Sequence, residues 1–492
     1  MSSAWGCSQE NEGPLPSFLA PLGGRWRAFA AAWGCSSLPT WWRSPAVTAV
    51  PQRLAVVGSG IAGLAAAWRL NNAPGPRREV TLFEADSRFG GHAHTVDLTL
   101  DGVRYGVDTG FLVYNHATYP SLVRLFGVLG VATAPAEMSF SVQVPDTDGP
   151  GLEWSGSSLN GVFAQRRNLL KPSFWRMLRD MLRFNRLTAE IAEQPGALAL
   201  DEPLADFLAR HRFSAVFSDQ YLLPMLGCIW SCPTEQMLRF PVATLIRFCH
   251  NHGLNRISDR PPWFTVRGGS REYVRKLISA IPDARLASPV RALRRSSVGN
   301  DGVWLATDQG SERFDAVVLA CHSDQALALL GEHASVDELQ VLGAIRSQAN
   351  RAVLHTDASL LPTRRNAWAA WNYERSTDAG RERSGVCLHY LINRLQPLPW
   401  QRPVLVSLNP LREPRAQDVH ADIAYTHPVF DRAALVAQGR LPSLQGQAGV
   451  WFAGAWTGYG FHEDGLRSGL EAAEAVLAAT AASTAEWEVR AA

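Results

Sequence analysis

The sequence has little net charge, few cysteines and no long apolar run, and each absence excludes a class of protein. Its 47 Lys and Arg residues nearly balance 45 Asp and Glu residues, for a formal net charge of +2, so no nucleic-acid partner is expected. The seven scattered cysteines do not suit a disulfide framework and are typical of a reducing cytoplasm. Cys228 and Cys232 have no second pair nearby, so no metal site is predicted. Without a run of about eighteen apolar residues, no transmembrane helix is predicted.

The size and composition are those of a folded protein with more than one domain. The chain has 492 residues, of which 46% are hydrophobic and 19% charged. Residues 1–50 differ, because they are rich in Trp, Ser, Gly and Pro, and no acidic residue occurs between Glu12 and Glu79. We expect residues 1–50 to be a poorly ordered extension and residues 481–492 to be a C-terminal tail.

A glycine-rich turn follows the first strongly apolar segment. Leu54–Val57 is suited to a strand buried on both faces of a parallel sheet, and Gly58, Gly60 and Gly63 come directly after it. These glycines permit a tight turn, close approach of a pyrophosphate and packing of a helix on the strand. Glu84 ends a second apolar run, where an acid can accept hydrogen bonds from a ribose. The order of strand, glycines, helix, strand and acid predicts a dinucleotide site.

The segments that follow carry a family resemblance. Arg88-Phe89-Gly90-Gly91-His92 comes soon after Glu84, and a second glycine signature, Val450–Gly454 continuing to Asp464–Gly469, stands near the C-terminus. With these motifs the sequence resembles the flavin-containing amine oxidase superfamily, which includes protoporphyrinogen oxidases and phytoene desaturases. The resemblance spans roughly residues 52 to 480.

The resemblance implies an α/β fold in which two domains are interleaved. A Rossmann-like FAD-binding domain, a parallel sheet with helices, is expected from residues 51–135, 260–325 and 445–480. An α+β substrate-binding domain is expected from residues 136–259 and 326–444. No cysteine stands in the local context that carries a covalent flavin in some members, so we expect non-covalent FAD.

By the same resemblance, Arg88 pairs with phosphate and the Gly90-Gly91 backbone lies against the cofactor. The backbone of Val290 contacts the adenine, Gly454 approaches the ribityl chain, and a helix starting at Gly465-Leu466 points at the isoalloxazine, where its N-terminus stabilises a reduced flavin. The complete set predicted to bind the cofactor is Gly58, Ser59, Gly60, Ile61, Ala62, Gly63, Glu84, Ala85, Arg88, Gly90, Gly91, His92, Thr109, Gly110, Phe111, Val290, Gly454, Trp456, Gly465 and Leu466.

Two positions depart from the amine oxidase pattern. Trp456 stands at or near the position of an acid, and His462 stands about where a tyrosine of the amine cage is expected. The segments 456–465 and 108–115 resemble a narrower group of bacterial flavoproteins associated with cyclopropane-fatty-acid synthase-type lipid methyltransferases. That likeness implies an acyl-lipid substrate and a lipid methyltransferase as partner.

The chemistry implied is hydride transfer from a substrate C–H bond to flavin N5, with dehydrogenation or desaturation of an acyl chain or polyene. His462 and Glu463 are the candidate catalytic bases, because they adjoin the helix start that faces the ring, whereas Asp464 suits a helix cap. Oxidation of a small amine is one alternative. A redox-neutral FAD isomerase or a flavin-binding accessory subunit is another.

One basic segment suggests where the protein contacts a lipid membrane. Residues 165–187 combine a single acid, Asp180, with apolar residues at near-helical spacing. This pattern predicts an amphipathic helix that binds anionic lipid, and hence a cytoplasmic protein that is peripheral at the inner face of the membrane. The alternative is an ordinary surface helix with a solvated basic face. The basic residues are Arg166, Arg167, Lys171, Arg176, Arg179, Arg183 and Arg186.

Overall fold

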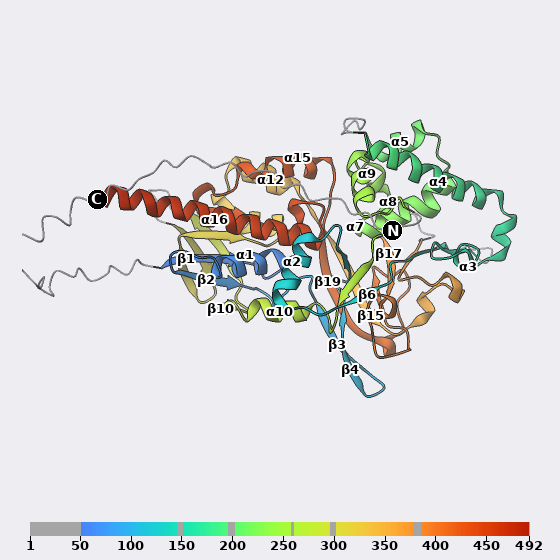
Figure 1. Ribbon diagram of the computed structural model, residues 1–492, viewed down its shortest axis with the longest axis horizontal. Helices are drawn as coiled ribbons and strands as arrows, with labels where there is room; N and C mark the ends of the chain where they lie inside the picture. The colour runs from blue at the N-terminus through green and yellow to red at the C-terminus, as the bar shows by residue number, and fades with distance from the viewer. Residues whose placement is uncertain are drawn as a thin grey trace, which may run out of the picture. The chain divides into compact units, whose positions relative to one another are not determined.

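A computed structural model describes residues 51–144, 151–194, 202–256, 260–295, 302–376 and 385–491. The extension predicted at residues 1–50 lies outside these ranges. Pro51–Ala492 form one unit. It contains two large sheets, and each sheet packs against its own set of helices (Figure 1). No helix of the described residues is long and apolar enough to cross a membrane.

The first sheet is parallel throughout and has five strands in the order β10-β2-β1-β14-β20. Its strands come from three distant parts of the sequence. They are β1 (Gln52–Val57), β2 (Arg78–Phe83), β10 (Asp283–Arg285), β14 (Ala316–Leu319) and β20 (Val450–Phe452).

Helices cover one face of the parallel sheet, and side chains of alternate strand residues such as Val56 and Val318 pack against them. The long helix α16 (His462–Ala491) lies alongside α1 (Ile61–Asn71) on this face (Figure 1). The same layer contains α2 (Pro120–Leu129) and α10 (Arg271–Ile278). The helix α16 continues to Ala491, where a separate tail was predicted, because the alanine-rich sequence favours helix.

The other face of the parallel sheet corrects the predicted domain limits. Val57 and Val317 face a layer that includes α12 (Val336–Ala344) and α15 (Arg432–Arg440), although residues 326–444 were all assigned to the substrate-binding domain. A parallel sheet needs both faces covered, and these two helices supply part of that cover. The rest of this layer is α11 (Ser323–Leu330) and an antiparallel sheet of β11 (Val290–Arg295), β12 (Val303–Thr307) and β13 (Gly310–Phe314).

The second sheet is mixed and has seven strands in the order β19-β15-β18-β17-β16-β7-β8, in which only β16 and β7 pair in parallel. Together with the parallel sheet it confirms the two-part α/β architecture. Its strands are β7 (Phe140–Val144), β8 (Leu152–Ser155), β15 (Ser347–His355), β16 (Trp371–Glu374), β17 (Cys387–Leu391), β18 (Leu405–Leu408) and β19 (Val419–Pro428).

One face of the seven-stranded sheet packs on a helical layer built mainly from residues 159–251. Aromatic side chains are numerous in this core, and Phe174 and Phe184 anchor the longest helix of the layer to it. The helices are α3 (Leu159–Val162), α4 (Pro172–Ala192), α5 (Leu204–Arg210), α6 (Ala215–Phe217), α7 (Leu223–Trp230), α8 (Thr234–Leu238) and α9 (Val242–Asn251).

Two small antiparallel sheets complete the fold. The hairpin of β3 (Thr95–Leu100) and β4 (Val103–Asp108) leads from the parallel sheet toward the mixed one. A three-stranded sheet joins β5 (Tyr114–Asn115), β9 (Trp263–Val266) and β6 (Thr133–Ala136).

Candidate functional site

The glycine turn lies at the carboxyl end of β1, where parallel sheets bind their ligands. Gly58 has a φ of +101°, and a Cβ there would lie 2.9 Å from the carbonyl oxygen of Ala320. A Cβ on Gly63 would overlap the carbonyl oxygen of Gly58. Both positions therefore require glycine, one for the turn itself and the other for the packing of α1 against it.

Gly60 is different, because a Cβ there would meet nothing within 4 Å. It is the N-cap of α1 and makes no side-chain capping bond, so the first N–H groups of the helix face this open space. Gly91 lies just across from it, since a Cβ on Gly91 would come within 3.0 Å of the Gly60 Cα. An open helix N-terminus between two glycine backbones is suited to a phosphate.

The predicted ribose acceptor is in place beside this turn. Glu84 lies at the end of β2, and its Oε2 accepts the backbone N–H of Ser59 at 2.8 Å. The backbone N–H of Ser288 donates to the Glu84 carbonyl oxygen at 2.8 Å, which brings the start of β11, with Val290, to the same end of the sheet. Residues from three segments thus meet at the nucleotide end.

Arg88, predicted to pair with phosphate, is held by nearby groups. Its Nη1 donates to the Gly91 carbonyl oxygen at 2.8 Å, and its Nε lies 3.6 Å from an oxygen of Asp86. These contacts hold the segment from Arg88 to His92 against the turn. Phosphate pairing by Arg88 stays a prediction.

A group of aromatic side chains surrounds His92. Its ring stacks on Tyr425 with centroids 5.0 Å apart, and the rings of His427 and His322 lie 5.2 and 6.2 Å away. Burial, followed by the charges of these two histidines, holds the pKa of His92 well below its usual value. Burial also lowers the pKa of His427 to about 4. These imidazoles are therefore neutral at physiological pH.

One atom in this group needs a partner. His92 Nε2 is buried, and among the described residues it has no hydrogen-bond partner. An orphaned buried polar atom costs stability unless a ligand satisfies it. The sequence reasoning missed Tyr425, His427 and His322, although the alternation of Tyr425 and His427 along β19 was the available signal.

The segment Thr109–Phe111 lies on the same side, as predicted. The backbone N–H of Phe111 donates to the His92 carbonyl oxygen at 2.8 Å, and the Thr109 hydroxyl lies 2.8 Å from the Tyr425 hydroxyl. A Cβ on Gly110 would overlap the same His92 carbonyl. Contacts with the segment that carries His92 and with Tyr425 thus explain the residue types at Thr109 and Gly110, whereas the Phe111 ring stacks on His462.

The second glycine signature packs two helices together, and its predicted approach to the flavin stays a prediction. A Cβ on Gly465 would lie 2.8 Å from Ile61 Cγ2, and a Cβ on Gly469 would overlap the Ala62 carbonyl oxygen. The two glycines let α16 approach α1 closely, with Leu466 fully buried between them. The helix also begins at His462, three residues before the predicted start.

Trp456 is a core residue in this structure. Its side chain is 2% exposed and packs with the hydrophobic cluster under the parallel sheet, and its Nε1 donates to the Cys321 carbonyl oxygen at 3.0 Å. The indole therefore faces the protein interior, not the open turn. Gly454, just before it, donates its N–H to the Ser468 hydroxyl at 2.9 Å.

The two candidate bases separate in the structure. His462 stacks on Phe111 with centroids 3.9 Å apart, and its Nε2 lies 2.6 Å from the Tyr273 hydroxyl. Burial lowers the pKa of His462 to about 3. Glu463 points away, because both carboxylate oxygens accept backbone N–H groups at the start of α2. Asp464 accepts the N–H of Phe461 at 3.1 Å, as expected of a capping residue.

A family comparison decides what kind of protein this is. The model of the flavin containing amine oxidoreductase family matches residues 61–379, more than half of the chain. The chain belongs to this family. It is accordingly a flavin-dependent oxidoreductase, and FAD is the flavin typical of the family.

Solved structures share this fold over most of the chain. Cyclohexylamine oxidase from Brevibacterium oxydans IH-35A matches with a TM-score of 0.61 at 17% identity, over 87% of this chain and 99% of that chain. A triple mutant of putrescine oxidase matches with 0.61 at 18% identity, over 87% and 99%. A CLA-producing fatty acid isomerase from P. acnes matches with 0.59 at 14% identity, over 85% and 97%. These likenesses show that the oxidoreductase shares their fold.

The residues at the turn fit a flavin dinucleotide. The uncapped N-terminus of α1 beside Gly60 suits the pyrophosphate, and Glu84, predicted to bind the ribose, lies beside the same turn. The buried Nε2 of His92 has no partner among the described residues and is free to hydrogen-bond a ligand. Gly58, Gly60 and Glu84 of the predicted cofactor site thus lie together at one edge of the parallel sheet, whereas Trp456 lies in the core.

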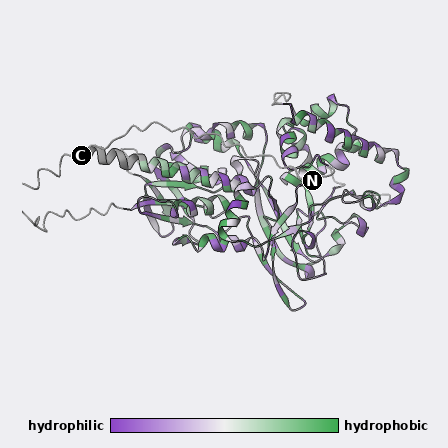
Figure 2. Cartoon of the chain, in the orientation of Figure 1, coloured by the Kyte–Doolittle hydropathy of each residue, from purple (hydrophilic) through white to green (hydrophobic). Residues whose placement is uncertain are grey.

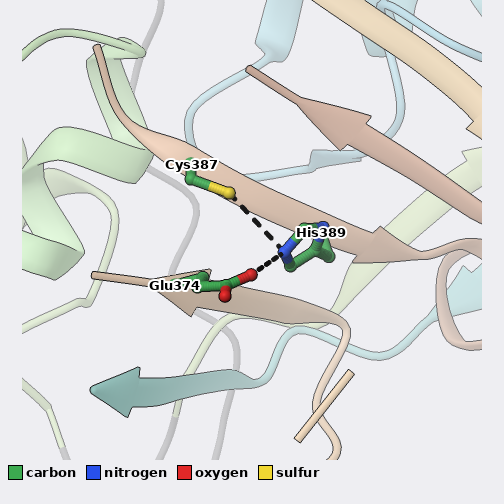
Figure 3. A group of neighbouring side chains, drawn as sticks. All are labelled: Glu374, Cys387 and His389. Atoms are coloured by element: carbon green, nitrogen blue, oxygen red, sulfur yellow. Dashed lines mark hydrogen bonds and ion pairs between the residues drawn. The ribbon is translucent and has the colours of Figure 1, made fainter. Parts of the chain in front are cut away.

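A second polar cluster lies outside this site, in the seven-stranded sheet. Figure 3 shows Glu374, Cys387 and His389 pointing toward one another from β16 and β17, with atoms that could bind a metal within 4.8 Å of one another. Protein groups already occupy them: His389 Nε2 lies 2.9 Å from Glu374, and Arg412 Nε donates to Glu374 at 3.0 Å. Arg412 thus supplies a positive charge beside the Glu374 carboxylate.

Proposed function

We propose that this oxidoreductase binds FAD non-covalently and dehydrogenates or desaturates a lipid acyl chain or polyene. The observation that carries the substrate class is an aromatic path from His252 to Phe461, the residue before His462. Phe461 stacks on Phe248 with centroids 5.0 Å apart, and Phe248 stacks on His252 with centroids 3.9 Å apart. The path is apolar, because burial lowers the pKa of His252 to about 4 and keeps its ring neutral.

The path begins at a hollow in the protein surface. His252 lines this hollow, whose volume is about 170 Å³, together with Met138, Leu254 and Trp263. Most of the side chains that line the hollow are apolar or aromatic, as in sites for hydrophobic ligands, and Arg260 adds a charged group. An acyl chain that entered here would meet the apolar side chains of the hollow beside the Arg260 cation, and the stacked rings of His252, Phe248 and Phe461 continue from it toward His462.

An amine substrate is less well served by the same geometry. A protonated amine needs a carboxylate or an open aromatic cage, and the two acids nearest the path are engaged elsewhere. Glu463 holds the start of α2, and Asp464 holds the loop at Tyr459 and Phe461. The residues around His92 are histidines and a tyrosine. Charge complementarity therefore favours a neutral substrate.

The chain's own residues position the reactants and receive the proton. When bound, the flavin supplies a hydride acceptor for one C–H bond. The neighbouring carbon then releases a proton, which we assign to the neutral imidazole of His462, held by the Tyr273 hydroxyl. An external electron acceptor, such as dioxygen or a quinone, takes the two electrons. A lipid methyltransferase acting on the same chains is the partner that the resemblance implies.

Redox-neutral rearrangement of an acyl chain is the second candidate, since a fatty acid isomerase shares the fold. Product mass separates the two. The purified oxidoreductase is incubated with acyl lipids and an electron acceptor, and the mass of the recovered acyl chains is measured by mass spectrometry. Desaturation removes two hydrogens from the chain, whereas isomerisation leaves the mass unchanged. Unaltered acyl chains beside oxidised amines would overturn the proposal.

A further inference from the structure

Large hydrophobic side chains are exposed together on one part of the helical layer. Of the twelve such side chains exposed among the described residues, five lie within residues 159–182. Leu170 is 86% exposed and Leu159 is 79% exposed, values that fit no buried packing role. A concentration of exposed apolar side chains marks an interaction site. The five are Leu159, Leu169, Leu170, Trp175 and Leu182.

The helix α4 shows how this surface is built. Its buried face carries Phe174, Met177 and Phe184, which pack in the core beneath the seven-stranded sheet. Trp175 and Leu182 stand on its exposed face, and hydrophobic and hydrophilic residues alternate along the helix in Figure 2. The Trp175 Nε1 donates to the Leu169 carbonyl oxygen at 2.9 Å, so the preceding turn, Arg166–Leu170, is fixed to the helix.

Basic side chains surround these apolar groups. The segment holds one acid, Asp180, which is 1% exposed and accepts the backbone N–H of Ser214 at 3.0 Å. The exposed charges of residues 159–187 are therefore all positive. The exposed cations are Arg166, Lys171, Arg176, Arg179, Arg183 and Arg186.

We propose that residues 159–186 form a docking surface for an anionic lipid membrane. Leucine and tryptophan side chains suit the boundary between headgroups and acyl chains, and the cations around them suit lipid phosphates. A nucleic acid would use the cations but leave Leu159 and Leu170 in water, so lipid explains both halves of the surface. The surface binds lipid headgroups whatever the oxidoreductase does with its substrate, so this inference does not rest on the proposed function.

Vesicle flotation tests the proposal with the full-length protein. The probes are phosphatidylcholine vesicles with and without phosphatidylglycerol, at low and high salt. We expect the protein to float with the anionic vesicles only, and high salt to release it, because ions screen exposed charges. Equal flotation with both kinds of vesicle, or with neither, overturns the proposal.

Two variants locate the binding surface. Replacing Arg176, Arg179 and Arg186 by Gln should weaken partitioning by roughly fivefold for each lost cation. The variant L159S/L170S should also weaken binding, but with the salt dependence retained. The matched control is R124Q/V128S on α2, where a cation and a 70% exposed valine lie outside the segment.

The thermal unfolding midpoint and the flavin content of each variant show whether it folds. Variants that fold and still bind anionic vesicles like the wild type contradict the assignment. If the control variant R124Q/V128S also lost vesicle binding, that result would contradict the assignment too. A surface that instead binds a second protein would give wild-type flotation with neither vesicle.

Discussion

The carboxylate of Glu463 lies at the N-terminus of α2, where its Oε1 accepts the backbone N–H of Ser121 at 2.8 Å. Its Oε2 accepts the next N–H, that of Leu122, at 3.0 Å. The residue before α2 makes no side-chain capping bond, so Glu463 satisfies N–H groups that the local sequence leaves open. A residue predicted as a catalytic base thus joins α16 to α2.

The variant E463Q should therefore lose stability and keep its chemistry. Gln offers one acceptor in place of two and no charge, which should lower the free energy of unfolding by about 1 kcal/mol. The rate of flavin reduction should stay within about twofold of wild type. Chemical denaturation and single-turnover kinetics measure the two effects, with E272Q on the exposed side of α10 as control. A slow enzyme of unchanged stability would restore Glu463 as a base.

Two neighbouring glycines should respond differently to alanine. G60A adds a methyl group to open space, so the free energy of unfolding should change by no more than about 1 kcal/mol while flavin binding weakens at least tenfold, by about 1.4 kcal/mol. G63A drives a methyl group into the Gly58 carbonyl, and should cost more than about 2 kcal/mol of stability.

The same substitution at Gly127, inside α2, meets nothing within 4 Å and serves as control. G127A should leave flavin binding unchanged and be neutral or slightly stabilising. Flavin titration by fluorescence and thermal unfolding give both quantities. Full flavin affinity in G60A would place the phosphates elsewhere.

The unpartnered Nε2 of His92 predicts a direct contact with the cofactor. H92A should weaken flavin binding about tenfold, because the contact and its stack on Tyr425 are both lost. H94A is the comparison: His94 Nδ1 lies 3.0 Å from the Tyr425 hydroxyl and so already has a protein partner. Equal losses in the two variants would contradict a special role for His92.

His462 should act as a base that stays neutral across the physiological range. Its pKa of about 3 predicts no change of the reduction rate from its own titration between about pH 5 and 8. H462Q should slow flavin reduction about a hundredfold with bound flavin retained. A limb of the pH profile near pH 6.5 that disappears in H462Q would show that His462 titrates in that range.

The buried cluster of Figure 3 predicts a pH-dependent stability. Burial alone would lower the pKa of His389, but Cys387 and Glu374 raise it to about 9. The folded chain thus favours the protonated form of His389. Its contribution to the free energy of unfolding is complete below about pH 6.5 and is lost as the pH rises through about 9. The contribution is on the order of 3 kcal/mol.

H389Q should therefore be less stable than wild type at about pH 6.5, and the difference should shrink toward about pH 9.5. Unfolding by denaturant across this range measures it, and the exposed His333, replaced by Gln, is the control. A difference that does not change with pH would mean that His389 is neutral in the fold.

The nucleotide end could be predicted from sequence because its signals are local. The apolar run Leu54–Val57, the glycines and Glu84 fall within some thirty residues, and each reports its own burial or turn. The contacts of Glu463 with Ser121 and of Gly469 with Ala62 join residues several hundred positions apart. No periodicity within either segment encodes such a partner, so the capping and helix-packing roles emerged only from the fold.

The histidines around His92 could not be predicted from the sequence for the same reason. His322 is the N-cap of α11, and His427 lies on β19. Both lie far from His92 in the sequence, and only the fold brings their rings within 7 Å of its ring.

Anaerobic reduction of the bound flavin tests the central claim most directly. The purified protein is freed of oxygen and mixed with acyl lipids or with small amines, and the visible flavin absorbance is followed. The account predicts a yellow protein whose absorbance is bleached by acyl lipids and is unchanged by amines. A protein without bound flavin, or one bleached by amines alone, would contradict it.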